Sequence, residues 1–184
     1  MRVISGKAKG TKLETLDGLD TRPTLDRVKE PLFSIIQNYI YEANVLDLFS
    51  GSGALAIESV SRGARNATSC DNSRKAVEII RQNVKKTHLE NEIKIINKDY
   101  KKALEELENE KFDIIFLDPP YKTNFGVESV RIIIEKNLLS EKGIIIFETD
   151  QEEKEFTENI ERYAIIKDLR KYGRAKLVFL SRKE

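Results

Sequence analysis

Short runs rich in Ile, Val and Phe alternate along this chain with longer amphipathic segments, and this alternation constrains the fold more than any other feature. The runs are continuously apolar, which is typical of strands that are covered on both faces in a mainly parallel sheet. Strands that alternate with helices indicate a three-layer α/β fold with helices on both faces. The predicted strands cover residues 44–49, 67–71, 92–97, 112–118, 143–149, 163–169 and 175–181. The predicted helices cover residues 54–62, 73–88, 100–109, 127–139 and 152–162.

The last two predicted strands differ from the others, because only a short KYGR stretch lies between them. A connection of this length predicts an antiparallel hairpin, since parallel strands need a crossover of a dozen or more residues. The sheet would then have seven strands, mostly parallel, with the hairpin at one side. A chain of 184 residues is long enough to bury a core and has the size of one domain. We therefore predict a single α/β domain over residues 1–184, with its core in residues 43–184.

Residues 1–42 precede that core and differ from it in composition. Residues 1–22 are basic and polar with short VIS and KLETL runs, which predicts a small hairpin. The stretch TRPTLDRVKEPLFSIIQNYI then predicts a helix that Thr24 could cap and that reaches about Tyr39. Pro31 lies inside this stretch, and a proline in a helix removes one hydrogen bond and clashes with the preceding turn. The helix could therefore kink at Pro31 or become regular only from that residue.

Positive charge is concentrated at the two ends of the chain, although the net charge is only +1. The first twelve residues contain no acid, and their cations are Arg2, Lys7, Lys9 and Lys12. Residues 167–183 contain many more cations than acids, since Asp168 is their only acid. Such basic ends are either solvated surfaces or sites that hold nucleic-acid phosphates.

Composition also narrows the classes of protein that this chain can belong to. Cys70 is the only cysteine, so neither an intramolecular disulfide nor a cysteine metal cluster can form. We expect Cys70 to be a small core residue, and the only histidine, His88, to be a surface residue rather than a ligand. The chain has no apolar run of membrane-spanning length and no signal-peptide core near its start. We expect a soluble, cytoplasmic monomer without a metal ion or a membrane partner.

The stretch DLFSGSGALAIE follows the first predicted strand and opens a helix. Gly51 and Gly53 allow the backbone to turn tightly beside a ligand, and the helix start presents free N–H groups. The second predicted strand ends in Asp71, whose carboxylate can accept hydrogen bonds from both hydroxyls of a ribose. Together these features predict a nucleoside-binding site. Ala56 stands where a dinucleotide motif has its third small residue, so the glycine motif alone leaves NAD open.

Asp99, in the stretch NKD, ends the third predicted strand and is a further candidate for this site. Its carboxylate could accept a hydrogen bond from an adenine amine. The same carboxylate could instead cap the helix that starts at Tyr100, and the two interpretations are compatible.

The stretch DPPY, residues 118–121, ends the fourth predicted strand. Asp118 therefore lies at the carboxyl edge of the sheet, where folds of this kind bind their ligands. Each proline forces the residue before it into an extended conformation, so the loop is stiff. The loop displays two acceptors, the Asp118 carboxylate and the Pro119 carbonyl, and Tyr121 adds a flat aromatic face.

This set of groups suits the methylation of a planar amine. The exocyclic amine of a base is a poor nucleophile, because its lone pair is shared with the ring. Two acceptors that bind its N–H groups can orient the amine, and a stacked aromatic ring, worth about 1–3 kcal/mol per base, can fix the plane. The alternative interpretation is a proline-rich turn with a packed tyrosine.

DLFSGSGALAIE, the acid in SCD and DPPY resemble the class I S-adenosylmethionine-dependent amine methyltransferases. RVISGKAKGTKL followed by RPTLDRVKEPLFSII resembles the 16S ribosomal RNA guanine-N2 methyltransferase family, as do SRGA and the closing YGRAKLVFL. The resemblance covers nearly the whole chain. It implies a Rossmann-like fold and methyl transfer from S-adenosylmethionine to the N2 amine of one guanine. The implied partner is 16S rRNA in an assembling small ribosomal subunit, and the implied product is S-adenosylhomocysteine.

Carried over residue by residue, the resemblance implies a role for each motif position. Gly51 and Gly53 would lie against the methionine part of the cofactor, with Asp47 near its amino group. Asp71 would hold the ribose and Asp99 the adenine. The implied cofactor-binding set is Asp47, Phe49, Ser50, Gly51, Gly53, Asp71, Asn72 and Asp99.

The resemblance implies two further sets of residues. In the catalytic loop, Asp118 and Pro119 would bind the target amine and Tyr121 would stack on the guanine. The implied catalytic set is Asp118, Pro119, Pro120 and Tyr121. The implied RNA-binding set is Arg2, Lys7, Lys9, Lys12, Arg22, Thr24 and Arg27. Pro31 departs from the small or polar residue expected at its position, which leaves the helix geometry open but not the chemistry.

Three other functions are weighed against this one. An adenine or cytosine amino-methyltransferase acting on other RNA or DNA would also use DPPY, but the DNA enzymes usually carry an inserted recognition domain. Only five residues, 122–126, separate Tyr121 from the next predicted helix, which leaves no room for one. A non-catalytic RNA-binding module would not need an intact DPPY. A nicotinamide dehydrogenase offers no explanation of DPPY.

Overall fold

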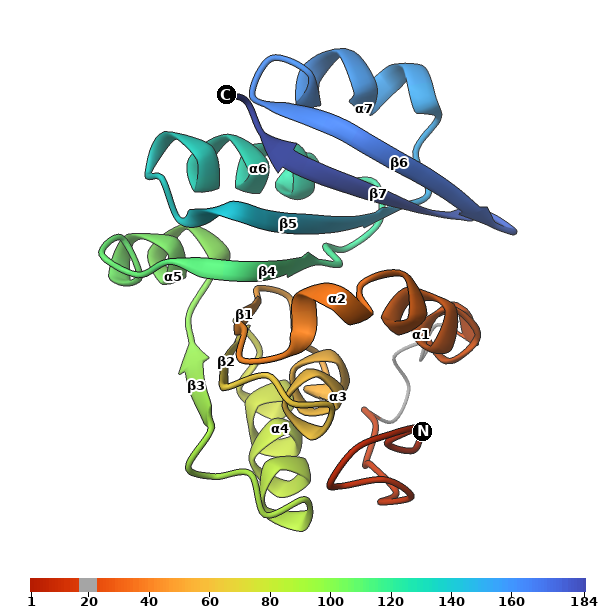
Figure 1. The fold of residues 1–184 in the computed structure, drawn as a ribbon, viewed down its shortest axis with the longest axis vertical. Coiled ribbons are helices and arrows are strands. Elements are labelled where there is room, and N and C mark those ends of the chain that lie inside the picture. The colour runs from red at the N-terminus through yellow and green to blue at the C-terminus, as the bar shows by residue number, and fades with distance from the viewer. Residues whose placement is uncertain (17–22) are drawn as a thin grey trace.

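A seven-stranded sheet forms the centre of the computed structural model, which describes residues 1–16 and 23–184 (Figure 1). The strands are β1 (Asn44–Asp47), β2 (Asn66–Asp71), β3 (Ile93–Asn97), β4 (Phe112–Leu117), β5 (Leu139–Thr149), β6 (Ala164–Tyr172) and β7 (Ala175–Arg182). Their order in the sheet is β3-β2-β1-β4-β5-β7-β6. The pairs among β1 to β5 are parallel, whereas β7 is antiparallel to both β5 and β6. The predicted mostly parallel sheet with a C-terminal antiparallel pair is confirmed.

The chain reverses its direction of travel across the sheet next to β1. It first builds β2 and β3 on one side of β1, and then returns to add β4 and β5 on the other side. Val45 pairs with Ala67 of β2 and with Ile114 of β4, which fixes the register of the three strands. Such a switch point opens a crevice outside the carboxyl ends of the strands, and ligands of this fold class bind there.

Helices cover both faces of the sheet, as the continuous apolar runs predict (Figure 1). Successive residues of a strand point to opposite faces, so Val45 lies in one hydrophobic core and Leu46 in the other. The first core includes residues of α1, α3 and α4, and the second includes residues of α5, α6 and α7. The helices are α1 (Pro23–Ile35), α2 (Gln37–Ile40), α3 (Ala54–Ser61), α4 (Arg74–Lys86), α5 (Tyr100–Glu106), α6 (Phe125–Glu135) and α7 (Glu153–Ile160).

The N-terminal segment, residues 1–16, is tied into the first core. Arg2 and Lys12 form an isolated antiparallel bridge, which gives the segment the shape of a small hairpin. The buried Glu58 of α3 accepts hydrogen bonds from the backbone N–H groups of Ile4, at 2.9 Å, and Ser5, at 3.1 Å. The buried Lys29 of α1 lies 3.2 Å from the Glu58 carboxylate and donates to the Arg2 carbonyl at 2.7 Å. Buried polar groups at two helices therefore hold this segment.

The predicted helix around Pro31 differs from the observed one in two respects. α1 begins at Pro23, so Thr24 lies in its first turn and is not the residue before it. Proline is well suited to the first helical turn, because its fixed φ matches the helix and its missing N–H would have no partner there. α1 also continues through Pro31, and the helical stretch is interrupted only at Ile36, before α2.

The connection between α6 and β5 was placed wrongly from the sequence. The predicted helix over residues 127–139 ends at Glu135 in the structure, and β5 already begins at Leu139. Leu138 and Leu139 are buried, and Leu139 pairs with Phe112 of β4. In the sequence these leucines continue the apolar pattern of the helix, but in the structure Leu139 pairs with β4 and belongs to the sheet.

Cys70 is buried in the second core, and His88 is exposed, as predicted. Across the described ranges, no helix is long and apolar enough to span a membrane. The same ranges contain no group of three or more His, Cys, Asp or Glu side chains placed to hold a metal ion.

Candidate active site at the carboxyl edge of the sheet

Four acidic residues stand at or just beyond the ends of the first four strands. Asp47 ends β1, Asp71 ends β2, Asp99 follows β3 by two residues, and Asp118 follows β4 directly. Because the four strands are parallel, these acids meet at one edge of the sheet. The structure therefore brings the predicted cofactor residues and the predicted catalytic residue to one edge.

The glycine loop between β1 and α3 depends on both of its glycines. Gly51 has φ +57° and Gly53 has φ +80°, values in the left-handed region that favours glycine. The Gly53 N–H donates to the Ser50 carbonyl at 2.8 Å, which closes the turn. A Cβ atom on Gly53 would also lie only 3.2 Å from Cγ2 of Ile80 in α4. The loop can therefore approach a ligand closely while α3 and α4 pack behind it.

Asp71 is held by backbone donors from two different loops. Its Oδ2 accepts the N–H of Gly51 at 2.9 Å, and its Oδ1 accepts the N–H of Ser73 at 2.9 Å. Ser73 also caps α4, whereas the neighbouring Asn72 is exposed. Each carboxylate oxygen has a second lone pair, so the oriented Asp71 can still accept hydroxyl donors from a ligand. This arrangement fits a ribose.

Asp47 is the most deeply buried acid of the edge, at 1% exposure. Its Oδ2 accepts a hydrogen bond from the Ser50 hydroxyl at 2.7 Å. Its Oδ1 is buried, and no donor within the described part of the chain reaches it. Burial raises the pKa of Asp47 to about 7 despite the Ser50 hydrogen bond, and the negative charges of Asp118 and Asp71 add to this rise. Such a carboxylate fits a cationic ligand group such as an ammonium.

Asp99 caps α5, as one of its two interpretations predicted. Its Oδ1 accepts the backbone N–H groups of Lys101 at 3.0 Å and Lys102 at 3.3 Å. A cap of this kind fixes the carboxylate at the edge of the sheet. Its predicted contact with adenine is compatible with the cap, because a carboxylate has two oxygens, and stays a prediction.

Three aromatic rings form a row from the glycine loop to the segment that follows DPPY. Only Phe49 among them was singled out from the sequence. The ring of Phe49 lies 5.6 Å from that of Tyr100, which lies 5.0 Å from that of Phe125. The Tyr100 hydroxyl donates to Glu128 at 2.5 Å, which helps to lower the pKa of that carboxyl group. Tyr100 follows Asp99, and Phe125 follows the DPPY loop, so adjacency to a motif was the available signal.

The DPPY loop is braced against the end of β5. Pro119 is buried, while Pro120 is exposed and Asp118 and Tyr121 are partly exposed. The Thr123 hydroxyl donates to the Pro120 carbonyl at 2.7 Å. The Thr123 carbonyl in turn accepts from the Gln151 side chain at 3.1 Å, just beyond β5. The stiffness expected from two adjacent prolines is thus reinforced by contacts outside the motif.

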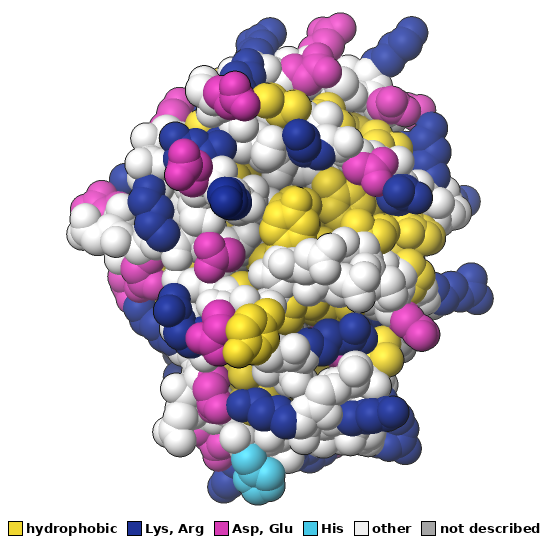
Figure 2. Space-filling view, viewed as in Figure 1, with side chains coloured by type: hydrophobic (Ala, Val, Ile, Leu, Met, Phe, Trp, Pro, Cys, Tyr) yellow, Lys and Arg dark blue, Asp and Glu magenta, His cyan; other side chains and the backbone are white. Residues whose placement is uncertain are grey.

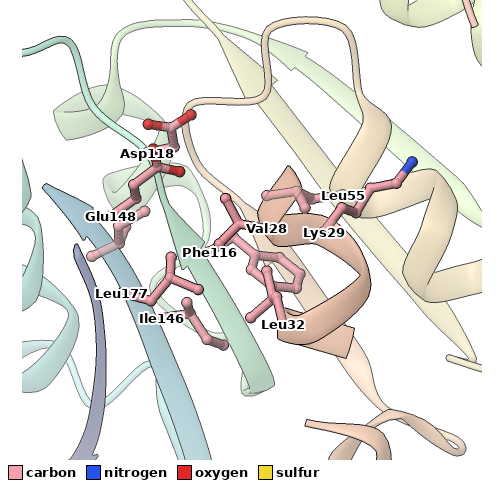
Figure 3. Close-up of a pocket in the computed structure, with 10 residues that line it drawn as sticks. Val28, Lys29, Leu32, Leu55, Phe116, Asp118, Ile146, Glu148 and Leu177 are labelled. Atoms are coloured by element: carbon pink, nitrogen blue, oxygen red, sulfur yellow. The ribbon is translucent and has the colours of Figure 1, made fainter. Parts of the chain in front are cut away.

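A pocket opens beside this loop, between α1 and the sheet (Figure 3). Asp118 and Glu148, from the ends of β4 and β5, lie close together at one end of it (Figure 3). Glu148 was not singled out from the sequence, because it lies inside the predicted strand 143–149 and not at its end. The apolar side chains that line the pocket are Val28, Leu32, Leu55, Phe116, Leu117, Ile146 and Leu177.

The predicted RNA-binding residues are placed unevenly. Lys7 forms an exposed ion pair with Glu92 at 2.7 Å, and the Arg2 guanidinium donates to the Gly10 carbonyl at 2.8 Å. Lys9, Lys12 and Arg27 are exposed. Arg22 and the side chain of Thr24 lie outside the described residues. Several Lys and Arg side chains lie, among other side chains, on the part of the surface in Figure 2 where Figure 1 places the N-terminal segment. RNA binding by these residues stays a prediction.

Comparison with known proteins identifies relatives of this chain. The model of a family described as "Conserved hypothetical protein 95" matches residues 1–181. "Putative rRNA methyltransferase YlbH" of Bacillus subtilis is 40% identical over 83% of this chain and 84% of its own length. "Ribosomal RNA small subunit methyltransferase D" of Haemophilus influenzae is 33% identical over 83% of this chain and 80% of its own length.

A solved structure shares the whole fold. The protein described as "Putative methyltransferase yhhF from Escherichia coli" superposes with a TM-score of 0.86 at 27% identity. The superposition covers 100% of this chain and 98% of that one. These matches confirm the resemblance drawn from the glycine loop, DPPY and the N-terminal motifs, and they confirm the methyltransferase fold.

Proposed function

We propose that this chain, which belongs to the family described as Conserved hypothetical protein 95, methylates the N2 amine of a guanine in 16S rRNA with S-adenosylmethionine as donor. The observation that carries this proposal is the position of Asp118 in a stiff loop at the edge that also holds Asp47 and Asp71. The names of the relatives from H. influenzae and B. subtilis support an rRNA substrate.

The cofactor half of the edge fits S-adenosylmethionine group by group. The cofactor supplies an activated methyl group on a sulfonium, and the protein holds the groups around it. The buried Asp47 would receive the ammonium of the methionine part, and Asp71 would accept the ribose hydroxyls. Gly51 and Gly53 let the backbone approach the methionine part. Asp99, Phe49 and Tyr100 would surround the adenine.

The DPPY half of the edge would position the amine that is methylated. Asp118 and the Pro119 carbonyl would accept the two N–H groups of the amine, which directs its lone pair at the methyl group. Tyr121 would stack on the base and fix its plane. Placement of this kind supplies much of the rate in a displacement of this type. The base must already be unpaired or be flipped out of its helix to reach the loop.

An assay with small ribosomal subunits that lack the modification tests the proposal. Labelled S-adenosylmethionine is offered to these subunits, to naked 16S rRNA and to duplex DNA, and the products are digested to nucleosides. We expect label in N2-methylguanosine from ribosomal RNA alone, and the more active of the two RNA samples identifies the substrate form. Label in methyladenosine, in methylcytidine or in DNA would overturn the guanine assignment. No label in any sample would instead favour a non-catalytic RNA-binding module.

A further inference from the structure

The turn of the C-terminal hairpin lies at the carboxyl edge of the sheet, on the side of the DPPY loop. β7 runs antiparallel to β5, and Lys176 of β7 pairs with Thr149, the last residue of β5. The turn between β6 and β7, residues 172–175, therefore stands just past the end of β5 (Figure 1). Asp118 follows β4, which is the other neighbour of β5 in the sheet. The hairpin thus brings a distant part of the chain to the edge that holds the predicted catalytic loop.

Side-chain contacts fasten this turn to the DPPY loop and to α7. The Lys176 amino group donates to the Gln151 carbonyl at 2.9 Å, and the Gln151 side chain donates to the Thr123 carbonyl at 3.1 Å. Lys171 pairs with Lys176 across the hairpin, and its amino group lies 3.3 Å from the Glu153 carboxylate of α7. Side chains of directly opposed residues lie on the same face of a sheet. One face of the hairpin is therefore braced, and the turn has a fixed place relative to the catalytic loop.

The turn presents one arginine at its tip. Tyr172 and Ala175 pair across the hairpin, so Gly173 and Arg174 form a two-residue turn. Gly173 has φ +64°, as expected of glycine at the first central position of such a turn. A Cβ atom on Gly173 would meet no described atom within 4 Å, so the turn stands clear of its surroundings.

Arg174 differs from the other cations of the turn in having no acid beside it. Lys171 is paired with Glu153, and the Arg170 guanidinium lies 2.7 Å from the Asp168 carboxylate. Arg174 is exposed, and the structure shows no ion pair between it and an acid of the described ranges. Its guanidinium is thus available to an anion that approaches the edge from solvent.

An RNA substrate brings anions to this edge. A base that reaches the DPPY loop has a phosphate on either side of it in the RNA chain. Asp47, Asp71 and Asp118 stand at the same edge, and their carboxylates repel those phosphates. A cation next to the loop offsets this repulsion, and a guanidinium can bind two phosphate oxygens at once.

We propose that Arg174 binds a backbone phosphate beside the target nucleotide, with the β6–β7 turn as a fixed arm of the RNA-binding site. This inference rests on the proposed function for its substrate, and it adds a contact that is separate from the DPPY loop and from the N-terminal segment. A phosphate contact positions the RNA without reading its sequence. Lys176 and Gln151 are positioning residues in this arrangement, because they connect the arm to the loop.

Arg174→Ala tests the contact through RNA affinity. We expect its dissociation constant for 16S rRNA at low salt to rise about three- to fivefold, the range of an exposed ion pair. The slope of log affinity against log salt should fall by about 0.7, because one counterion contact to a single strand is lost. Filter-binding titrations measure both quantities. Arg174→Lys keeps the charge and should retain the slope, while kcat at saturating RNA and affinity for S-adenosylmethionine should be unchanged in both variants.

Arg182→Ala is the matched control, because Arg182 is an exposed arginine at the opposite end of the same hairpin, paired with Ala164. Its RNA affinity and salt slope should equal those of the wild type. A loss of affinity in Arg182→Ala as large as in Arg174→Ala would assign the effect to overall charge and overturn the local contact.

RNA fragments with one uncharged methylphosphonate linkage locate the phosphate. The linkage is moved stepwise along the strand around the mapped target position. We expect a linkage beside the target nucleotide to weaken binding of the wild type and to leave binding of Arg174→Ala unaltered. Equal sensitivity of both proteins at every linkage, or an unchanged salt slope in Arg174→Ala, would overturn this inference and leave the proposed function intact. Absence of N2-methylguanosine with the wild type would overturn the proposed function, and the salt slopes would still decide whether Arg174 binds RNA.

Discussion

The carboxyl edge of the sheet and the N-terminal segment use charge in opposite ways. The edge gathers acids, and their carboxylates are buried or fixed by backbone N–H groups, as at Asp47 and Asp71. The N-terminal segment gathers cations, and Lys9 and Lys12 extend from it into solvent. Its backbone, in contrast, is anchored by the buried acid Glu58. The edge thus has charges in fixed orientations, whereas the N-terminal segment has exposed charges on a backbone that is anchored.

This difference indicates which ligand groups each region can take. Oriented carboxylates suit donors in fixed positions, such as an ammonium, ribose hydroxyls and the N–H groups of a base. They repel phosphates, so an RNA backbone needs a separate basic surface. Exposed lysines suit phosphates, which contribute affinity without requiring exact placement. Substitutions at the edge should therefore change turnover or cofactor affinity, and substitutions in the segment should change RNA affinity alone.

Asp118→Asn should produce the largest separation between the two regions. The amide keeps the size of the side chain but replaces one charged acceptor at the reacting amine. By analogy with the loss of one oriented group at a reacting centre, we expect kcat to fall by about 100- to 1000-fold. Single-turnover methyl transfer measures this loss, while titrations should show unchanged affinity for cofactor and for RNA. Retained turnover would remove Asp118 from the reaction.

Asp71→Ala tests the cofactor half of the edge. The variant loses the carboxylate that orients Gly51 and Ser73 and that would accept the ribose hydroxyls. Hydrogen bonds to a charged group contribute about 1.5–3 kcal/mol, so the dissociation constant of S-adenosylmethionine should rise by about 10- to 100-fold. Calorimetric titration measures it, with Asp168→Ala on the exposed part of β6 as control. An unaltered constant would show that the ribose binds elsewhere.

Asp47 makes cofactor affinity depend on pH. Its pKa is raised to about 7 by burial, so much of the free protein carries a neutral Asp47 below that pH. An ammonium ligand favours the ionised form, and binding must then release a proton. Affinity for S-adenosylmethionine should therefore rise by about tenfold between pH 5.5 and 7 and level off above. Titrations in this range measure the slope, which Asp47→Asn should abolish.

The raised pKa of Asp47 can also be checked independently, through its effect on the free energy of unfolding. Because the folded pKa of Asp47 lies above the ordinary value of 3.8 for an aspartate, the folded state binds more protons between pH 4 and 7. Its contribution to the free energy of unfolding must then fall as pH rises through that window, in the absence of cofactor. Chemical denaturation of wild type and Asp47→Asn gives this contribution by difference. A pH-independent difference would contradict the raised pKa.

Much of the edge could be predicted from the sequence, because its signals are local. A strand, a glycine turn and an acid at the end of the next strand follow one another within about 25 residues. Parallel pairing then brings Asp47, Asp71 and Asp118 together without further information. The cap at Asp99 was foreseen for the same reason, because the helix that it caps follows it directly.

The anchoring of the N-terminal segment could not be predicted, because its contacts are not local. Ile4 and Glu58 are 54 residues apart in the chain, and neither has a pattern that pairs them. An acid and a lysine on helices usually indicate solvated surfaces, yet Glu58 and Lys29 are almost fully buried. Long-range pairing of charged residues is the information that the sequence pattern lacks.

Lys9→Ala combined with Lys12→Ala should have the smallest effect and sharpens the comparison most. Deleting the segment would also remove the partners of Glu58, so substitution of exposed side chains is the cleaner change. If both lysines contact phosphates, the slope of log affinity against log salt should fall by about one to two units, because each contact releases a counterion. Filter-binding titrations of rRNA across a salt series measure this slope.

The control variant combines Lys142→Ala with Lys154→Ala, at exposed positions of β5 and α7, and should leave the slope unchanged. Cofactor affinity should be equal in all three proteins. An unchanged slope in the Lys9 and Lys12 variant would make the basic segment an ordinary solvated surface, and the phosphate contacts would then have to come from another basic surface of the chain.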